Sequence, residues 1–307
     1  MIGYIARRLV QSVLVLAGVS VIVFGLMFLT GDPAALMMPV DLTVGRQQIE
    51  QFRREMGFDR PFHEQYLRYA SRAVRGDLGE SLWQRRPALS LITDRLPATL
   101  ELAFAALAVS LAVGVPVGII AAIRRGSIVD AVATVVAVAG NSMPVFWLGI
   151  VLILIVSVWL GLLPASGRGG IERLILPAIT LGAYSGSITA RLLRSSLLEV
   201  LSKDYVRTAR AKGLHARTVI LRHSLKNAAL PVVTVIGLQM GHLLGGAIIT
   251  ETVFAYPGMG LLAIQAVRNR DVPVAQAFVL MVALIFILVN LFVDVLYRYL
   301  DPRVRYA

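Results

Sequence analysis

The sequence predicts an all-α polytopic membrane protein with six transmembrane helices, and three observations support this fold class. First, the 307 residues are 57% hydrophobic and only 16% charged, whereas a soluble domain carries about 25% charged residues. Second, apolar runs of about 20 residues recur along the chain, long enough to cross a hydrocarbon layer of roughly 30 Å. Third, the basic residues gather between these runs, as they do in membrane proteins.

The composition also limits the classes of partner. A net charge of +12 can indicate a nucleic-acid-binding protein, but the sequence has no basic patch interleaved with aromatic residues. Anionic lipid headgroups explain the basic loops more simply, so we expect a lipid bilayer and no nucleic acid as a partner. The chain has no cysteine, which excludes disulfides and thiol chemistry.

The first span is predicted at Leu9–Thr30, after a short basic lead that contains Arg7 and Arg8. This run is too long for the apolar region of a cleavable signal peptide, and no small-residue cleavage site follows it. The polar segment after it, residues 32–97, carries ten arginines and nine acids and is nearly neutral. Long loops cross membranes largely regardless of charge, so this segment is expected outside the cell membrane.

Within the polar segment, the apolar pattern predicts short amphipathic helices at Gln47–Met56 and Phe62–Val74, followed by a turn at Gly76–Gly79. Two interpretations of the segment remain open. It is either a cap over the helix bundle at the membrane interface or a docking surface for an external binding protein. We favour a cap that also contributes to docking.

Five further spans are predicted at Leu102–Ile123, Ala131–Leu160, Leu174–Ala190, Val232–Thr250 and Ala275–Val293. The second of these five is unusual, because no charge occurs between Ala131 and Gly167. That stretch is too long for one upright helix and too short for two with a turn, so we predict one long tilted helix. Glycines at small-xxx-small spacing favour close helix packing. These are Gly114, Gly118, Gly182, Gly186, Gly237, Gly241 and Gly245.

The longest basic loop, residues 195–230, contains all three lysines of the chain. A short helix is predicted at Val206–Ala211, with Ser202 as its N-cap and Gly213 as its C-terminal stop.

A second helical stretch is predicted at Arg217–Ala229, and Pro231 is expected at the start of the next helix. Lys203, Arg207 and Arg210 share one face of the first helix by their spacing. Cytoplasmic loops of membrane proteins are generally basic, so basicity alone would indicate only the topology.

The sequence contains no phosphate-loop, zinc-protease or nucleophile-elbow motif. We therefore expect no enzymatic activity, no catalytic residue, no metal site and no cofactor in this chain. Polar residues within spans are candidates for a translocation path. These are Asn141, Gln239 and His242. The alternative for each is a hydrogen bond between helices.

Several ordered motifs are more specific than the composition. The basic loop has Tyr205, then Arg-Thr-Ala-Arg-Ala-Lys-Gly at residues 207–213 and Leu-Pro at 230–231. Gly-Asp-Pro follows the first span, residues 251–260 read Glu-x-Val-Phe-x-x-Pro-Gly-x-Gly, and the chain ends in Asp-Pro-Arg-Val-Arg-Tyr-Ala. These stretches resemble the permease subunits of ABC importers in the dipeptide, oligopeptide and nickel branch. Arg207 and Thr208 replace the Glu-Ala of the general family loop, and both this and the longer gap before Leu-Pro match the peptide-type branch.

This resemblance implies the transmembrane-domain fold of type I ABC importers. The loop would form a coupling helix that docks into a separate ATPase subunit. Its coupling residues would be Tyr205, Arg207, Thr208, Ala209, Arg210, Ala211, Lys212, Gly213 and Leu214. ATP and Mg would belong to two partner ATPase subunits, a second homologous permease subunit would complete a heterodimer, and an extracytoplasmic solute-binding protein would deliver the substrate.

The resemblance also implies di- or oligopeptide substrates, with nickel chelates and glutathione-like solutes as alternatives. An ion-coupled secondary transporter is a second class, but it needs paired intramembrane acids, which spans two to five lack. The expected location is the bacterial cytoplasmic (inner) membrane with both termini in the cytoplasm, since nearly all of the net charge falls on that side. Four segments follow: residues 1–31 (first helix), 32–97 (extracytoplasmic), 98–300 (five-helix core with the coupling loop) and 301–307 (cytoplasmic tail).

Overall fold

A computed structural model shows a protein built from helices. It describes residues 2–29, 34 and 46–300, and at some helix positions in these ranges the backbone alone. Within the described part of the chain, β pairing is limited to an isolated bridge between Glu80 and Pro87. The predicted all-α class is therefore confirmed. The Gly-Asp-Pro motif and the C-terminal tail, residues 301–307, lie outside the described residues.

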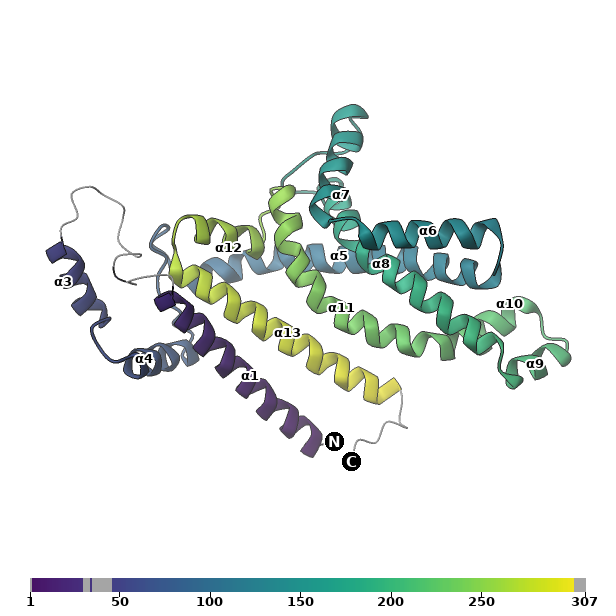
Figure 1. The fold of residues 1–307 in the computed structure, drawn as a ribbon, viewed down its shortest axis with the longest axis horizontal. Coiled ribbons are helices and arrows are strands. Elements are labelled where there is room, and N and C mark those ends of the chain that lie inside the picture. The colour runs from purple at the N-terminus through teal and green to yellow at the C-terminus, as the bar shows by residue number, and fades with distance from the viewer. Residues whose placement is uncertain (1, 30–33, 35–45, 301–307) are drawn as a thin grey trace. The chain divides into compact units, whose positions relative to one another are not determined.

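The chain divides into two compact units. The first joins Met1–Pro97 to Gly258–Leu288, and the second joins Ala98–Pro257 to Val289–Ala307. Figure 1 shows the helices. Those wholly or mostly in the first unit are α1 (Ile2–Leu29), α3 (Arg46–Met56), α4 (Phe62–Val74), α12 (Met259–Arg268) and α13 (Val272–Leu300). Both short amphipathic helices predicted in the polar segment are thus confirmed, one to the residue and the other to within one residue.

In the first unit, an aromatic cluster packs α4 on the second half of α1. The ring centroid of Phe24 lies 5.5 Å from that of Phe62. It lies 5.8 Å from Tyr66 and 5.1 Å from Tyr69. The hydroxyl groups of Ser20 and Tyr66 share a hydrogen bond of 2.8 Å. Aromatic pairs contribute about 0.5–1.5 kcal/mol each beyond the area they bury, so α4 is firmly attached to a membrane helix.

The predicted turn at Gly76–Gly79 follows α4 directly. Gly76 and Gly79 have φ of +83° and +88°, in the left-handed region that glycine enters without strain. The Asp77 carboxylate accepts a hydrogen bond from the Arg72 guanidinium at 2.7 Å and one from the Gly79 amide at 3.0 Å. These two contacts, the first above all, hold the pKa of the Asp77 carboxyl below its ordinary value.

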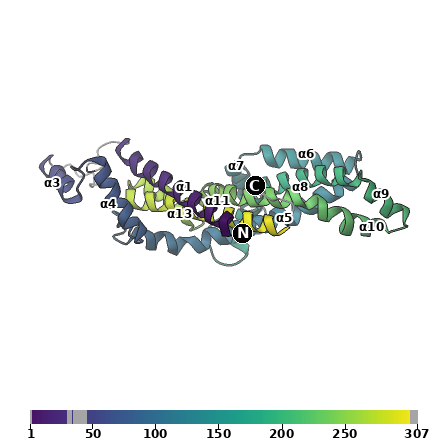
Figure 2. The same ribbon diagram turned by 90° about the horizontal axis from the view of Figure 1, so that it is seen from below.

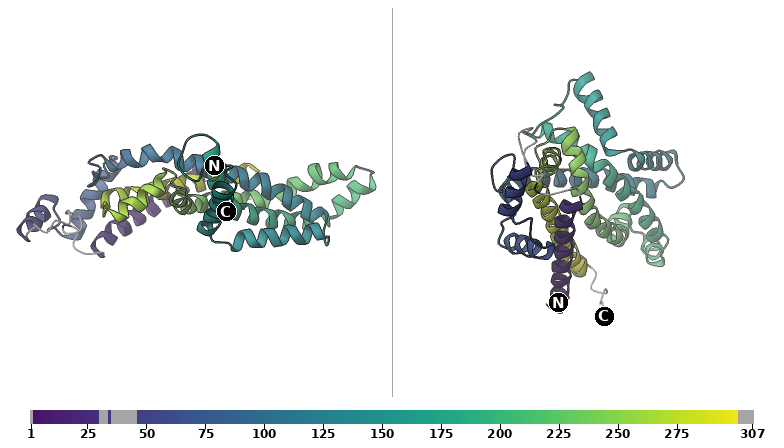
Figure 3. Two further views of the ribbon diagram at one scale, coloured as in Figure 1. Left: turned by 90° about the horizontal axis from the view of Figure 1, so that it is seen from above. Right: turned by 60° about the vertical axis from the view of Figure 1, so that its left-hand side comes forward.

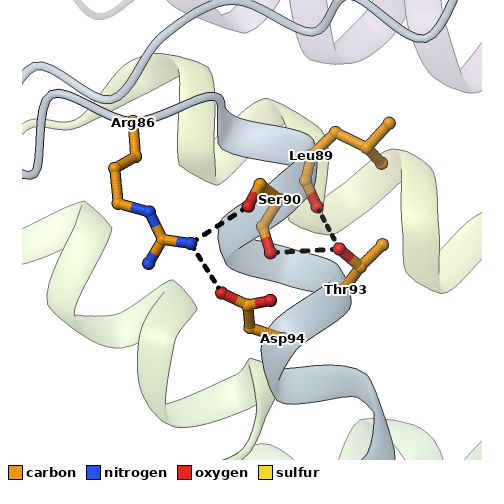
Figure 4. A network of polar contacts seen from close by, with 5 residues as sticks. All are labelled: Arg86, Leu89, Ser90, Thr93 and Asp94. Carbon is orange, nitrogen blue, oxygen red and sulfur yellow. Dashed lines mark hydrogen bonds and ion pairs between the residues drawn. The ribbon is translucent and has the colours of Figure 1, made fainter.

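The next helix, α5, covers Ala88–Ile123, so it begins well before the predicted start, and that prediction was wrong. Arg86 holds its first turns by donating to the Ser90 hydroxyl at 3.1 Å and to the Asp94 carboxylate at 2.8 Å, as Figure 4 shows. The helix then continues through Pro97. A criterion based on apolar runs missed this end because Asp94, Arg95 and Pro97 interrupt it.

In the second unit, α8 (Glu172–Leu201) occupies a central place. The helices that pack on it include α6 (Ile128–Ser142), α7 (Val145–Leu152) and α11 (Leu225–Val253), and Figure 3 shows the molecule from two further sides. The buried core of this unit includes Leu102, Leu176, Leu181, Leu243, Phe254 and Tyr256.

Glycines bring α5 and α8 into close approach. A Cβ added at Gly114 or Gly118 would lie 2.7 Å from a carbonyl oxygen of α8, and one at Gly182 would lie 2.5 Å from a carbonyl oxygen of α5. Gly186 is less tight, with 3.4 Å to the backbone of Ser110. Backbone atoms cannot turn aside as a side chain can, so the first three positions exclude any larger residue unless the helices separate.

The glycines of α11 lie in other surroundings. Gly237 faces the Val293 side chain of α13, whereas a Cβ at Gly245 would meet nothing within 4 Å. Gly241 is partly exposed. The glycines of this helix are therefore not equivalent, although their spacing is regular.

The third predicted span is bent. α6 ends at Ser142, and the next segment, α7 with the π-helix η1 (Ile153–Trp159), lies at 107° to it. Met143 between them is extended, with ψ of 130°, because proline pushes the preceding residue out of the helical region. Pro144 then opens the new helix, where its missing N–H costs nothing. The prediction of one long tilted helix was wrong because it gave this proline too little weight.

An ion pair fixes the start of α6 to α8. The Arg194 guanidinium donates to both carboxylate oxygens of Asp130, at 2.6 and 2.8 Å. The same carboxylate accepts from the Gly126 amide at 3.0 Å, and Asp130 is only 6% exposed. Arg194 itself is partly exposed, but its loss would leave the nearly buried Asp130 carboxylate without its charge partner, so this contact holds the start of α6 to α8.

Within the described residues, four helices are long and apolar enough to cross a membrane: Arg7–Phe28, Ala88–Ile123, Ala216–Gly241 and Val272–Val293. The bent pair is a fifth if it forms one span. The sixth prediction, Leu174–Ala190, falls in α8, which is 30 residues long but has a lower mean hydropathy because small polar residues interrupt it. Each predicted span thus corresponds to a long helix or to the bent pair.

Candidate functional site: the basic helix of the long loop

The long loop folds into two short helices between α8 and α11. α9 covers Asp204–Ala211, α10 covers Ala216–Thr218, and the π-helix η2, Val219–Ser224, leads directly into α11. Figures 1 and 2 show α9 and α10 at one end of the second unit. The helix predicted at Val206–Ala211 is confirmed and begins two residues earlier.

The N-cap of α9 is Lys203, not Ser202 as predicted. Lys203 has φ of −73° and ψ of 149° and makes no side-chain cap. The Ser202 hydroxyl instead donates to the Glu199 carbonyl at 2.7 Å, in the last turn of α8. The two helices follow so closely that Ser202 serves the end of the first. Asp204 in the first turn of α9 supplies the negative charge that favours a helix N-terminus.

The other end of α9 is a Schellman motif at Gly213, as the sequence predicts. Gly213 has φ of +75°, and its amide donates to the Arg210 carbonyl at 2.9 Å. The Leu214 amide donates to the Ala209 carbonyl at 3.4 Å, which completes the pattern. A Cβ at Gly213 would meet nothing within 4 Å. The glycine is therefore needed for its backbone conformation and not for space.

Two inward side chains attach α9 to the rest of the loop. Val206 (0% exposed) and Ala209 (8%) form a cluster with Val219 (1%). We call this cluster of three side chains the α9 seat. Val200 and Leu201, at the end of α8, pack against it. Ala209 was predicted to contact a partner, but its side chain is buried on the inner face of α9. Ala209 follows Val206 at i+3 in an otherwise polar helix, and this spacing is the pattern that indicates a buried face.

A hydrogen bond also joins α9 to the first turn of α11. The Asn227 side-chain amide donates to the Tyr205 hydroxyl at 2.9 Å and to the His223 carbonyl at 3.4 Å. The helix α9 is thus held to the membrane helix by one polar contact in addition to its apolar seat.

Pro231 does not start the next helix. It lies inside α11, and the helical path is continuous from Ala216, so that prediction was wrong. A proline inside a membrane helix loses one backbone hydrogen bond, which neighbouring helices and local adjustments compensate. The consequence is one continuous helical path from the loop into the membrane.

The outer surface of α9 is exposed. Except for Ala209, all the predicted coupling residues lie on it or on the turn that follows: Tyr205, Arg207, Thr208, Arg210, Ala211, Lys212, Gly213 and Leu214. The surface is thus continuous and open to a partner.

The basic side chains of this surface form only weak ion pairs or none within the described residues. Lys203 lies 3.0 Å from Glu199, and Arg207 lies 3.7 Å from Asp204, but exposed pairs of this kind contribute about 1 kcal/mol or less. Arg210 and Lys212 have no ion pair within the described residues. A partner with acidic groups would therefore displace little in binding here.

The three candidates for a translocation path are not brought together by any contact in the described residues. Asn141 is half-buried at the end of α6, beside the bend. Gln239 in α11 is 3% exposed, and neither atom of its amide has a hydrogen-bond partner in the described part of the chain. The side chain of His242 lies outside the described residues.

Sequence reasoning missed one buried polar contact in the second unit. Glu251 is fully buried and accepts a hydrogen bond of 2.7 Å from the Thr99 hydroxyl. Thr99 precedes the predicted start of the second span at Leu102, so no pattern connected the two residues. The contact fixes the end of α11 to α5.

Apolar helices long enough to span a membrane and a basic helix exposed on a loop are features of a polytopic membrane protein. Residues 114–306 match the family described as binding-protein-dependent transport system inner membrane component. Residues 1–103 match the N-terminal family of the same membrane components. The chain belongs to this family of importer permease subunits, in its peptide-type branch, and is a multi-pass inner membrane protein.

Full-length relatives support this assignment. The dipeptide transport system permease protein DppB of Escherichia coli is 42% identical over 338 residues, covering 100% of this chain and 99% of the relative. The glutathione transport system permease protein GsiC of Escherichia coli is 44% identical over 307 residues and is covered completely, as is this chain. Both relatives are permease subunits, and such subunits work with separate ATPase and substrate-binding partners.

Solved structures share the fold. An inward-facing MetNI methionine ABC transporter superposes with a TM-score of 0.57 at 18% identity, covering 69% of this chain and 97% of that one. A second crystal form of the same transporter has a TM-score of 0.58 at 20% identity, with 69% and 96% covered. At such identities the match shows the fold alone, and it confirms the fold class of ABC importer transmembrane domains.

Proposed function

We propose that this chain is one of two homologous permease subunits of an ATP-driven importer for short peptides. Two relatives at 42% and 44% identity, matched over their whole lengths, are named for a dipeptide and for glutathione. Both solutes are small peptides, so a short peptide is the substrate class that these relatives support. In this assembly, two ATPase subunits bind on the cytoplasmic side and a solute-binding protein delivers substrate from outside.

The proposed topology places both termini and α9 in the cytoplasm. Nearly all of the net charge of +12 then lies on the cytoplasmic side, in agreement with the positive-inside rule. On this topology the long polar segment faces outward and serves as a cap that contributes to docking of the binding protein.

One observation supports the coupling role above all: the outer face of α9 is exposed, while its inner face is firmly attached to the rest of the second unit. Its outer surface is open, while Val206 and Ala209 are buried on Val219 and Tyr205 is bonded to Asn227. Because the helical path continues from Ala216 through α11, a displacement of α9 moves a membrane helix. ATP-driven closure of the ATPase subunits would act on this path and switch access between the two sides of the membrane.

A matched set of glycine variants tests this role. Gly213→Asp places a carboxylate on the coupling surface and strains a turn at φ of +75°. Gly170→Asp does the same to the turn before α8, where φ is +78° and a Cβ also meets nothing within 4 Å. Gly213→Asn adds a side chain of the same size at the coupling site without the charge and with little backbone strain, because asparagine tolerates this conformation better than most residues.

We expect Gly213→Asp to lose ATPase subunits during purification in mild detergent and to lose ATP-dependent uptake in proteoliposomes, with normal insertion. Gly170→Asp should retain both, and Gly213→Asn should lie between. Equal behaviour of the two aspartate variants would show that strain, and not docking at α9, is responsible. Normal uptake by Gly213→Asp would exclude the coupling role.

The substrate class needs its own measurement. The full importer with its binding protein is reconstituted, and uptake of a labelled dipeptide is measured with unlabelled dipeptide, glutathione or free amino acids as competitors. Competition by the two peptides and not by amino acids is the expected result. Uptake that peptides fail to reduce would exclude a peptide substrate without affecting the permease assignment.

A further inference from the structure

Two cavities adjoin each other in the first unit, where the last turns of α1 approach the start of α13. One, which we call the polar cavity, has a volume of about 360 Å³ and is lined by charged and amide side chains together with apolar ones. The other, of about 480 Å³, is lined almost wholly by apolar side chains. Leu78, in the turn after α4, lines both. A ligand with a polar head and an apolar tail would therefore find both environments within reach.

The polar cavity carries an excess of positive charge. Its lining includes four guanidinium groups, from Arg60, Arg68, Arg72 and Arg85, against the carboxylates of Asp77 and Glu80. The Arg72 guanidinium is already engaged by Asp77 at 2.7 Å. Within the described residues, Arg68 and Arg85 form no ion pair. Guanidinium groups recognise phosphate through paired, charge-assisted hydrogen bonds, so this cavity suits a phosphate.

Three buried polar atoms that line this cavity have no hydrogen-bond partner in the described part of the chain: the Tyr69 hydroxyl, Gln65 Oε1 and Gln276 Nε2. Gln276 is only 9% exposed. The Gln65 amide is oriented by its Nε2, which donates to the carbonyls of Phe58 and Arg60 at 3.2 and 2.7 Å, so its Oε1 remains an acceptor. An unsatisfied buried polar atom costs about 1–3 kcal/mol, and three around one cavity indicate a ligand.

The protonation of Tyr69 agrees with a donor role. Burial, and to a smaller extent the neighbouring Tyr66, raises the pKa of the Tyr69 phenol to about 12. The phenol is therefore protonated at neutral pH and donates a hydrogen bond. Together with Gln276 Nε2 it offers donors to phosphate or ester oxygens, while Gln65 Oε1 offers an acceptor to a hydroxyl group.

The apolar cavity follows two membrane helices. Its lining includes Val13 and Leu16 of α1, Ala70 and Ala73 of α4, and Leu280 of α13. Leu280 lies about 12 Å along α13 from its first residue at a rise of 1.5 Å per residue. This cavity therefore extends from the end of the helix into the depth of the hydrocarbon layer, where an acyl chain lies.

We infer that the first unit binds an anionic phospholipid of the phosphatidylglycerol type. The phosphate lies at Arg68 and Arg85, the glycerol hydroxyl groups donate to Gln65 Oε1, and an acyl chain occupies the cavity along α1 and α13. The excess of guanidinium over carboxylate groups favours a headgroup with net negative charge over a zwitterionic one. The lipid joins α1 and α4 to α13 and satisfies the three buried polar atoms.

A charge-matched pair of variants tests this site in the complete importer. Arg68→Gln/Arg85→Gln removes the two guanidinium groups assigned to the phosphate. Arg54→Gln/Arg75→Gln removes two exposed guanidinium groups from the same polar segment that line neither cavity. Binding of phosphatidylglycerol, phosphatidylethanolamine and inorganic phosphate to the delipidated complex is followed by native mass spectrometry and by the shift in its thermal unfolding.

We expect phosphatidylglycerol to bind the unmodified complex and the control alike. The Arg68/Arg85 variant should bind it about thirtyfold more weakly, which corresponds to about 2 kcal/mol, since each basic residue near a membrane surface contributes about 1 kcal/mol. Ala73→Phe, which fills the apolar cavity and leaves the guanidinium groups intact, should also reduce lipid binding without changing any response to inorganic phosphate.

Three outcomes overturn the inference. Equal affinities for phosphatidylglycerol and phosphatidylethanolamine would remove the preference for an anionic headgroup. Stabilisation by inorganic phosphate as strong as that by the lipid would assign the polar cavity to a free anion. Equal loss of lipid binding in the control variant would show a general effect of surface charge instead of a built site.

Discussion

The α5–α8 interface and the α9 seat are both contacts between helices of the second unit, yet they are built in opposite ways. The interface brings backbone against backbone at Gly114, Gly118 and Gly182, with carbonyl oxygens where a Cβ would lie. The α9 seat consists of three small apolar side chains beneath an exposed helix. At the interface, a single added carbon atom would collide with backbone. At the seat, the outer side chains of α9 can change their charge without touching the buried cluster. The interface therefore determines whether the unit folds, and the seat determines whether α9 is attached.

The largest effect on stability is expected from Gly182→Ala, which adds a single methyl group to the α5–α8 interface. Its Cβ would lie 2.5 Å from the Ala106 carbonyl oxygen, so the two helices must separate. Overpacking of this kind costs about 1–3 kcal/mol, measured as a lower temperature of thermal unfolding of the purified permease in detergent.

The control for this variant is Gly245→Ala in α11, where a Cβ meets nothing within 4 Å. Alanine favours helix over glycine by about 1 kcal/mol, so this variant should unfold at the same or a higher temperature. If both variants unfold at the same temperature, close backbone approach is not what stabilises the α5–α8 contact.

A smaller and more local effect is expected from Val206→Ala, which empties part of the α9 seat. Loss of two methyl groups from a fully buried position costs about 1–2 kcal/mol. Because the seat holds only α9, the cost should appear as faster hydrogen exchange of the α9 amides, by about tenfold, with the unfolding temperature of the whole unit unchanged.

Thr208→Ala, an exposed change on the same helix, should leave α9 exchange nearly unaltered. A Val206→Ala variant that lowers the unfolding temperature of the whole unit as much as Gly182→Ala would contradict the distinction between the two contacts.

The sequence predicted these two regions with different success, for physical reasons. The span positions, the α9 helix and its Gly213 stop follow from local patterns of apolar residues and from one residue that enters the left-handed region easily. The N-cap was wrong because Ser202 had two helix ends within reach, and only packing decides between them. Ala209 was assigned to the outer surface because a motif records which residues occur and not which side they face.

The bend of the third span and the early start of α5 show a second limit. Pro144 was visible in the sequence, but whether it kinks, ends or merely tilts a helix depends on the helices around it. The Arg86 network at the start of α5 joins residues up to eight positions apart, so none of these residues alone indicates a helix. Contacts such as Thr99 to Glu251 and Asp130 to Arg194 link distant helices and leave no local pattern.

The smallest effect is expected from Tyr205→Phe, which removes only the hydroxyl that accepts the 2.9 Å hydrogen bond from Asn227. A solvent-exposed hydrogen bond of this kind lies at the lower end of the usual range and contributes about 0.5–1 kcal/mol. Exchange of the α9 amides should therefore rise about two- to fivefold, less than in Val206→Ala, and the ATPase activity of the complete importer should become less dependent on substrate.

A double-mutant cycle with Asn227→Ala separates this hydrogen bond from other effects of each change. If the bond attaches α9 to α11, the two changes together should cost no more than the larger one alone, because either removes the same contact. Fully additive effects would show that the residues act independently, and the apolar seat alone would then hold α9. That result would make the contrast between the two regions sharper, since three side chains would then carry the whole attachment of the coupling helix.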